Sequence, residues 1–280
     1  MFPVAMTVAT LAMASGVEGA TFFAPIFLLG LGLPPDVAIA TGLLTEVFGF
    51  ASGVSSYVYR RVVDWRLAAS LAAVSVPAAV TGGLIGGRVS PEILETILGV
   101  GLFAVAVSFL RAPDADETAR LDRSVEQDFG ESRGERCVRP RTGEPVCYTV
   151  CNRGEGRALA GIGGLFMGMI STGLGELNGY FLLRRCRVPS RVAVGTGVTV
   201  VAVTALAAAG THVVRLSSAG GDAMATVLSI AVFTVPGVIV GGQLGPALAA
   251  RLPDHVVERS LGVLFALVGA LMLAKVVLVR

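Results

Sequence analysis

The chain has 280 residues, of which 54% are hydrophobic and only 15% are charged. This composition excludes an ordinary soluble protein, which covers its surface with far more charge, and it predicts an integral membrane protein embedded in the lipid bilayer. The formal net charge of +2 gives no reason to expect a nucleic-acid partner. The 36 glycines suit closely packed membrane helices, in which small side chains let two backbones approach.

The first apolar stretch, Phe2–Leu33, is too long for a single membrane span, which needs about twenty residues. A polar, glycine-rich segment, Ser15–Thr21, interrupts it. This pattern predicts two half-helices that meet at an unwound point, an arrangement tolerated at membrane depth only where protein or water covers the freed backbone. The pattern leaves open whether the chain turns back at the break or continues across the membrane.

Three uninterrupted spans follow and complete a first membrane repeat, residues 1–111: Val37–Tyr59, Leu67–Gly87 and Ile93–Leu110. The composition then changes abruptly, because residues 112–156 hold ten acidic and seven basic residues, half of all the Asp and Glu in the chain. Such a segment cannot bury enough apolar surface to offset its chain entropy. We therefore interpret residues 112–156 as a disordered cytoplasmic linker.

Three of the four cysteines, Cys137, Cys147 and Cys151, lie in this linker, and Cys186 lies near a basic turn farther on. Their spacing, with no histidine nearby, favours neither a metal site nor a disulfide. We interpret them as loop cysteines without a catalytic role.

A second membrane repeat, residues 157–280, has the same plan as the first. Its opening apolar stretch, Ala158–Leu183, is interrupted by the polar segment Ser171–Gly179. Three uninterrupted spans follow: Val192–Val214, Ala223–Ala250 and Val256–Val279.

Three motifs recur in the same order, roughly 155 to 163 residues apart. The segment from Pro34 to Thr41-Gly42 matches the segment from Pro189 to Thr196-Gly197. The segment from Pro77 to Gly82-Gly83 matches that from Pro236 to Gly241-Gly242, and the segment from Glu95 to Leu98-Gly99 matches that from Glu258 to Leu261-Gly262. The predicted fold class is therefore all-α, a polytopic membrane helix bundle made of two repeats with broken helices. The Gly-Gly pairs are interpreted as helix-packing faces.

The arginines indicate how the two repeats are oriented. In the first repeat the loop before Leu67 holds Arg60, Arg61 and Arg66, whereas the loop at Pro34 has no basic residue. In the second repeat this bias is reversed, because the loop at Pro189 is rich in arginine and the next loop holds only Arg215. Under the positive-inside rule, equivalent loops then face opposite sides of the membrane. This predicts inverted repeats, with each broken element re-entrant, an arrangement typical of secondary transporters.

Three carboxyl groups lie inside apolar stretches: Glu18, Glu46 and Glu176. A charge at the centre of a bilayer costs at least ~2.5 kcal/mol, so such residues usually face a cavity or a partner. Aligning the repeats puts Glu18 and Glu176 at nearly the same place in the two breaks. We favour a role in the substrate path or a proton relay for these two, and a structural role, as a neutral hydrogen-bond partner, for Glu46.

The ends of half-helices present free N–H groups and a positive dipole, so they attract anions without a basic side chain. Half-helices beginning near Gly19 and Gly179, with Thr41 and Thr196 close by, would form a pseudo-symmetric anion site near the midplane. The neighbouring carboxyl groups would have to be protonated for an anion to bind there. The candidate substrate-binding residues are Gly16, Glu18, Gly19, Thr41, Gly42, Gly175, Glu176, Asn178, Gly179, Thr196 and Gly197.

The membrane portion shows no nucleophile with an adjacent base, no phosphate-binding loop and no cluster of His, Cys and Asp. The sequence therefore predicts no enzymatic activity, no cofactor and no metal. The expected partners are a small anionic solute and the lipid bilayer, with a homo-oligomer left open.

The chain resembles the TauE/SafE family of sulfite-exporter-like membrane transporters. The resemblance covers nearly the whole chain apart from the linker, and it rests on Gly16–Pro25, on Leu33–Thr41 and on the Pro…Gly-Gly-x-x-Gly helix in both halves. It departs where Glu18 and Glu176 interrupt the family's glycine run, and where glycine replaces serine at positions 42 and 197.

The resemblance implies a multi-pass transporter of the cell membrane that moves sulfite or a related sulfur oxyanion or organosulfonate by alternating access at the junction of the repeats. The alternative is a membrane scaffold or assembly subunit that transports nothing. The intramembrane glutamates favour the transporter, because a bundle that only packs gains nothing from carboxyl groups at mid-depth.

Overall fold

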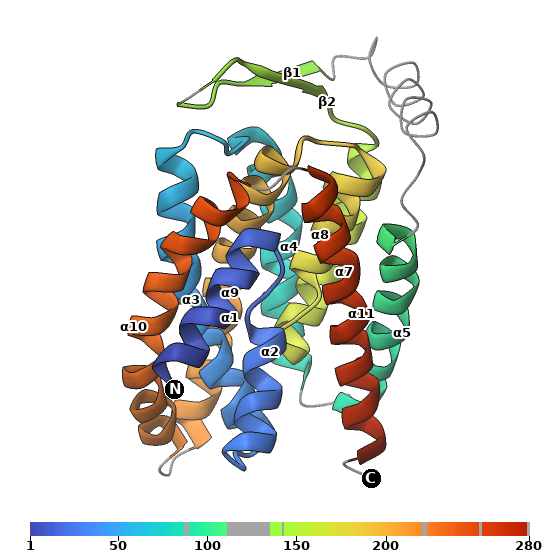
Figure 1. Ribbon diagram of the computed structural model, residues 1–280. Helices are drawn as coiled ribbons and strands as arrows, with labels where there is room; N and C mark the ends of the chain where they lie inside the picture. The colour runs from blue at the N-terminus through green and yellow to red at the C-terminus, as the bar shows by residue number, and fades with distance from the viewer. Residues whose placement is uncertain (87–89, 111–134, 142, 220–222, 252–253, 279–280) are drawn as a thin grey trace.

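The computed structural model describes residues 1–86, 90–110, 135–141, 143–219, 223–251 and 254–278. These residues form a helical bundle with a two-stranded hairpin lying across one end (Figure 1). The first half contains α1 (Phe2–Ser15), α2 (Ala20–Pro25), the π-helix η1 (Ile26–Gly30), α3 (Pro35–Tyr59), α4 (Trp65–Ile85) and α5 (Pro91–Leu110). The strands β1 (Glu135–Val138) and β2 (Val146–Thr149) follow. The second half contains α7 (Arg153–Ile170), α8 (Leu174–Gly179), the π-helix η3 (Tyr180–Arg185), α9 (Ser190–Ala219), α10 (Ala223–Ala249) and α11 (Asp254–Leu278).

Four helices among the described residues are long and apolar enough to cross a membrane: α3, α4, α9 and α10. Their outward faces carry large apolar side chains that are more than 60% exposed, among them Leu84, Leu206, Val232 and Phe233. Apolar surface of this extent is unfavourable in water and is suited to contact with lipid. The prediction of a helical membrane protein is confirmed.

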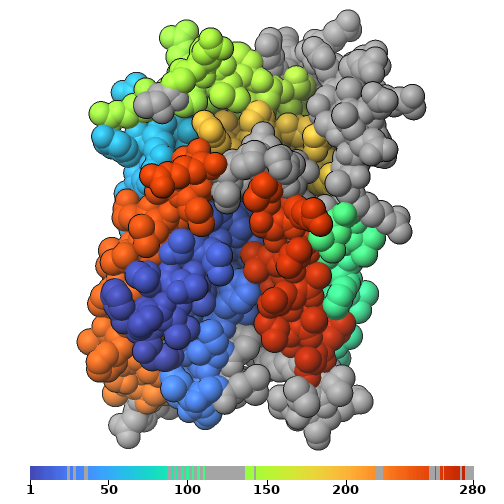
Figure 2. Space-filling model, in the orientation of Figure 1, coloured from blue at the N-terminus to red at the C-terminus, as the bar shows by residue number. Residues whose placement is uncertain are grey.

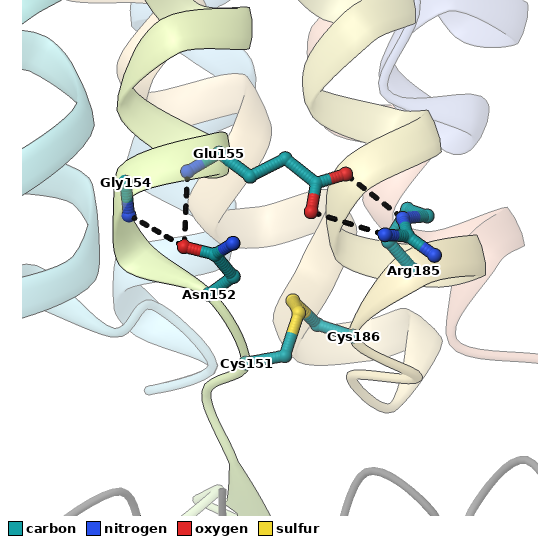
Figure 3. The surroundings of a disulfide bond; sticks show 6 residues. All are labelled: Cys151, Asn152, Gly154, Glu155, Arg185 and Cys186. Atoms are coloured by element: carbon teal, nitrogen blue, oxygen red, sulfur yellow. Dashed lines mark hydrogen bonds and ion pairs between the residues drawn. A yellow bond between two sulfur atoms is a disulfide. The ribbon is translucent and has the colours of Figure 1, made fainter. Parts of the chain in front are cut away.

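Both interrupted stretches are broken where the sequence predicts. α1 is followed by Gly16, whose φ of 80° is left-handed, and α7 is followed by Ser171 and Gly173, with φ of 59° and 115°. The second break is re-entrant, because Cys151, just before α7, forms a disulfide with Cys186, just after η3. Both ends of that element therefore lie at the same end of the bundle (Figure 3).

The glycine pairs are confirmed as packing faces, and each helix that carries one packs against a helix from the other half of the chain. In α4, a Cβ on Gly82 or Gly86 would meet the backbone of α7 at Leu165 or Met169. In α10, a Cβ on Gly241 would meet the backbone of α1. Each Gly-Gly helix thus packs on the broken helix of the other half, which places the two breaks side by side in the middle of the bundle. Figure 2 shows the outer surface of α1 lying between α10 and α11.

The second part of the charged segment is ordered, which corrects the expectation of a disordered linker from 112 to 156. Strands β1 and β2 pair antiparallel with Cys137 opposite Cys147. Residues 112–134, the first part of that linker, lie outside the described residues.

The structure also pairs the four cysteines, whose spacing in the sequence favoured neither a metal site nor a disulfide. Cys137 is joined to Cys147 across the hairpin, and Cys151 is joined to Cys186. The second bond is accompanied by an ion pair between Glu155 and Arg185, with Nε to Oε1 at 2.8 Å (Figure 3). The start of α7 and the end of η3 are therefore held together both covalently and electrostatically.

Asp64 fastens the hairpin to the bundle. Its carboxylate caps α4 by accepting hydrogen bonds from the N–H groups of Arg66 and Leu67, and it also accepts from Arg136 at 2.8 Å and from the Tyr148 hydroxyl at 2.7 Å. Burial tends to raise the pKa of this carboxyl, but the hydrogen bonds and the charge of Arg136 outweigh it and hold the pKa below its usual value.

We expect Asp64→Asn to loosen the hairpin while leaving the helix cap intact, because Asn is also a good cap residue but carries no charge to pair with Arg136. The docked hairpin should lose about 1 kcal/mol, a value reduced for partial solvent exposure. Because the pKa of Asp64 is lowered on folding, its contribution is fully present above about pH 3.9 and is lost as the pH falls through the folded value. Hydrogen-exchange protection of residues 135–149, corrected for intrinsic rates, would measure both effects. The exposed Glu144 in the hairpin turn, changed to Gln, is the matched control and should alter neither.

Candidate substrate site

The two breaks meet in the interior. The backbone N–H of Gly175, in α8, donates a 2.6 Å hydrogen bond to Oε1 of Glu18, which follows α1. A Cβ on Gly175 would lie only 2.9 Å from the carbonyl oxygen of Gly16, so only glycine permits this approach. Residues 157 positions apart in the sequence are thus in direct contact.

Glu176 lies on the other side of the same contact. Its Oε2 accepts from the Gly173 N–H at 3.0 Å, and its Oε1 accepts from the hydroxyls of Thr21 and Thr172. Thr21 and Thr172 also bond to each other at 2.5 Å. Each break therefore supplies one threonine and one carboxyl group to a shared buried network.

Glu46, to which the sequence interpretation gave a structural role as a neutral hydrogen-bond partner, also contacts the first break. It is 2% exposed, and its Oε1 accepts a 3.1 Å hydrogen bond from the Ala20 N–H at the start of α2. The signal in the sequence was the carboxyl group itself, in the middle of an apolar span. Its separation from the first break, 26 residues along the chain from Ala20, concealed the contact.

Several polar atoms around the breaks are buried without a hydrogen-bond partner among the described residues. They are Glu18 Oε2, Glu46 Oε2, the Ser171 hydroxyl oxygen, and both amide atoms of Asn178. Buried polar groups in proteins are nearly always satisfied, so a cluster of unsatisfied ones indicates a place where water or a bound solute is accommodated. We call this cluster, together with the three glutamates, the break site.

The structure corrects the start of one of the two predicted half-helices. The second half-helix, α8, begins at Leu174, and Gly179 instead marks the point where α8 continues into η3. The first half-helix, α2, does begin beside Gly19.

The two threonines predicted beside the breaks bond elsewhere. The Thr41 hydroxyl donates to the carbonyl of Val37 within α3, and the Thr196 hydroxyl oxygen accepts from the Asp64 N–H. The glycines that follow them, Gly42 and Gly197, are buried in their helices. Of the predicted residues, those at Gly16, Glu18, Gly175, Glu176 and Asn178 gather at the break site, whereas the four at positions 41, 42, 196 and 197 form no hydrogen bond to it in the described part of the chain.

Comparison with known proteins identifies the family. A profile of the family described as "Sulfite exporter TauE/SafE" matches residues 1–272. The chain belongs to the TauE/SafE family. It is a membrane transporter by family, and the break site lies within the segments that the profile covers.

Two relatives of this TauE/SafE protein are similar over parts of the chain. The "Probable membrane transporter protein YunE" of Bacillus subtilis (strain 168) is 21% identical over 248 residues, which cover 89% of this chain and 84% of the relative. The "Probable membrane transporter protein ORF9" of Sinorhizobium sp is 32% identical over 93 residues, 32% of this chain and 36% of the relative. No solved structure matches the chain. Within the described residues, no group of three or more His, Cys, Asp or Glu side chains is arranged to hold a metal ion.

Proposed function

We propose that this TauE/SafE protein is a secondary transporter, and not an enzyme, of the cell membrane, and that it moves sulfite or a related small sulfur oxyanion through the break site by alternating access. The observation that supports this most is the cluster of unsatisfied buried atoms where the two breaks touch. A scaffold that only packs would gain nothing from burying the Asn178 amide, the Ser171 hydroxyl and Glu18 Oε2 without partners among the described residues, because each such group costs about 1–3 kcal/mol.

The contacts suggest how an anion would bind there. The N–H group of Gly175 donates a hydrogen bond to the carboxyl group of Glu18, and the N–H group of Ala20 donates one to the carboxyl group of Glu46. Both N–H groups would suit an oxyanion. Each carboxyl group therefore occupies a position that a substrate oxygen could take. A protonated carboxyl group is a weaker acceptor, so it would release the N–H to the substrate and could itself donate a hydrogen bond to it. Anion binding and proton uptake would then be coupled.

The inverted arrangement of the two repeats remains part of this proposal, and it is supported by what lies at the two ends of α9. The residues after Pro34 contact the far end of α9, since Val37 and Ala40 cluster with Leu216. Pro189, the equivalent of Pro34, immediately precedes the start of α9 at Ser190. With 26 residues between Ser190 and Leu216, and a rise of 1.5 Å per residue, these ends are about 39 Å apart, enough to span a bilayer.

The disulfides bear on which end faces outward. Disulfides persist in oxidising compartments and are rare in the cytosol. The hairpin end, which carries both, is therefore proposed to be extracytoplasmic, opposite to the cytoplasmic side that the sequence interpretation favoured. The arginines at that end point the other way under the positive-inside rule, but several have structural partners, such as Arg136 with Asp64 and Arg185 with Glu155.

Single cysteines at Pro34 and Pro189, introduced one at a time, test both statements. A membrane-impermeant maleimide applied to intact cells should label the cysteine at 189 and leave the one at 34 unlabelled until the membrane is opened. Labelling of both from the same side would contradict inverted repeats. Labelling of only the cysteine at 34 would keep the inversion but place the hairpin in the cytoplasm.

Transport itself is tested with purified protein in liposomes. We expect saturable movement of sulfite, thiosulfate or sulfoacetate, with chloride at equal ionic strength as the control and protein-free liposomes as the blank. Absence of transport for the whole panel, with the protein correctly folded and inserted, would contradict the proposed substrate class.

A further inference from the structure

We propose that a basic cavity beneath the hairpin is an anion-binding vestibule, in which a small oxyanion is collected before it enters the break site. The cavity has a volume of about 480 Å³ and lies where the hairpin meets the ends of α1, α3, α9 and α10. We call it the arginine vestibule, after Arg60, Arg141 and Arg191 in its wall. The proposal deepens the proposed function and rests on it for the identity of the anion.

The three arginines come from three separate parts of the chain. Arg60 follows α3, Arg141 belongs to the hairpin, and Arg191 opens α9. No acidic side chain is among the described residues that line the cavity. Three positive charges around one cavity without a carboxylate produce a local positive potential that concentrates anions.

Two of the three arginines, Arg141 and Arg191, are held in place by contacts that do not neutralise them. The guanidinium of Arg141 lies 4.1 Å from the centre of the Tyr59 ring, and the backbone N–H of Arg141 donates to the carbonyl of Arg60. Arg191 donates from Nη2 to the carbonyl of Ala250 at 3.3 Å. These partners are an aromatic ring and neutral carbonyl oxygens, so the positive charges remain available to a ligand.

The size and the polar wall of the vestibule suit a hydrated anion. At about 30 Å³ for each water, its volume corresponds to roughly 16 water molecules. Ser56, Ser190 and Gln243 add uncharged hydrogen-bonding groups to the wall. A sulfur oxyanion could therefore enter with much of its hydration shell, which lowers the cost of leaving bulk water.

The floor of the vestibule is close to the first break. Ala14, at the end of α1, and Val194, in α9, both line the cavity. Val194 Cγ1 is only 3.4 Å from the position that a Cβ on Gly16 would take. Tyr57, another lining residue, donates its hydroxyl to the carbonyl of Met13 at 2.5 Å. About one layer of side chains therefore separates the vestibule from the backbone of the break.

The hairpin completes the vestibule. Pro140 and Arg141 lie between the two strands that the Cys137–Cys147 disulfide joins, and the hairpin is fastened to the bundle by Asp64. Figure 1 shows the hairpin extending across the end of the bundle toward α3. The position of Arg141 over the cavity thus depends on a segment that the helical bundle does not itself supply.

The test compares Arg60→Gln, Arg141→Gln and Arg191→Gln with Arg61→Gln. Arg61 is exposed and adjacent to Arg60 but does not line the cavity, so it removes the same charge from the same end of the protein. Binding of sulfite and of sulfate to purified protein would be measured by the shift in thermal unfolding, at constant ionic strength adjusted with chloride. Each vestibule variant should weaken oxyanion binding by roughly fivefold, as expected for loss of one charged partner at a partly solvated site, and Arg61→Gln by less than twofold.

The same variants would be assayed for transport in liposomes. The vestibule variants should raise KM with little change in kcat, because the vestibule collects the anion and does not move it. Equal effects of Arg61→Gln and Arg141→Gln on binding would overturn the proposal, since they would show general surface charge and not a site. Arginine-dependent binding by a protein that transports none of the anions would support the vestibule while contradicting the proposed function, so the two failures are distinguishable.

Discussion

Glu18→Gln and Glu176→Gln are expected to keep anion transport but abolish its dependence on a proton gradient. The carboxyl group of Glu18 accepts a hydrogen bond from the N–H of Gly175. That of Glu176 accepts from the N–H of Gly173 and from the hydroxyls of Thr21 and Thr172. A Gln side chain has nearly the same shape as a protonated glutamic acid, carries no charge and can donate a hydrogen bond to an anion, but it cannot gain or lose a proton. The variants would thus be fixed in the state that we propose binds the anion.

The measurement is the initial rate of anion movement into liposomes with and without an imposed pH gradient. In the native protein a gradient should change the rate about tenfold, which corresponds to about 1.4 kcal/mol of coupling, and in either variant the ratio should fall to about one. Glu155→Gln is the matched control, because Glu155 is a partly exposed carboxylate paired with Arg185 at the surface. Unchanged pH dependence in both break-site variants would show that the glutamates are structural hydrogen-bond partners.

Gly168→Ala is expected to have the largest effect on stability. Gly168, in α7, faces α4 so closely that a Cβ would overlap the carbonyl oxygen of Ala79 and lie 2.7 Å from the backbone nitrogen of Gly83. Backbone atoms cannot move aside as a flexible side chain can, so α4 and α7 would have to separate. Overpacking usually costs about 1–3 kcal/mol, and a clash with two backbone groups of α4 should reach or exceed the upper value.

The matched control is Gly210→Ala in α9, where no atom lies within 4 Å of the added Cβ. That change should be neutral or stabilise the protein by about 0.4–1 kcal/mol, because alanine restricts the unfolded chain. Thermal unfolding of the purified protein in detergent compares the two directly. Equal melting temperatures for both variants would contradict close packing of α4 on α7, and with it the arrangement that brings the two breaks together.

The glycines connect these two predictions. Gly168 lets α7 approach α4, and Gly175, seven residues later, lets α8 approach Gly16 and Glu18. Loosening the first contact should therefore also disturb the second. We expect Gly168→Ala protein that remains folded to transport more slowly than the native protein, even though Gly168 contributes no polar group to the break site.

The sequence by itself determined those features that depend on local composition. Apolar length predicted the helices, and runs of glycine with polar residues predicted the interruptions after α1 and α7, because a helix cannot remain regular where left-handed backbone is required. The recurring motifs led to the alignment of Glu18 with Glu176, and the structure brings both to one site. The family followed from the same residues.

Only the tertiary structure decided which distant groups meet. Glu46 joins the break site because α3 passes the start of α2, while Thr41 and Thr196 are directed to other partners. The pairing of Cys151 with Cys186 depends on the re-entrant path of α7 and α8, and the arginine vestibule on a hairpin docked through Asp64. Hydropathy and local spacing record whether a residue is buried or where a helix stops, whereas a hydrogen bond or a disulfide depends on the relative positions of two packed elements, which no local pattern specifies.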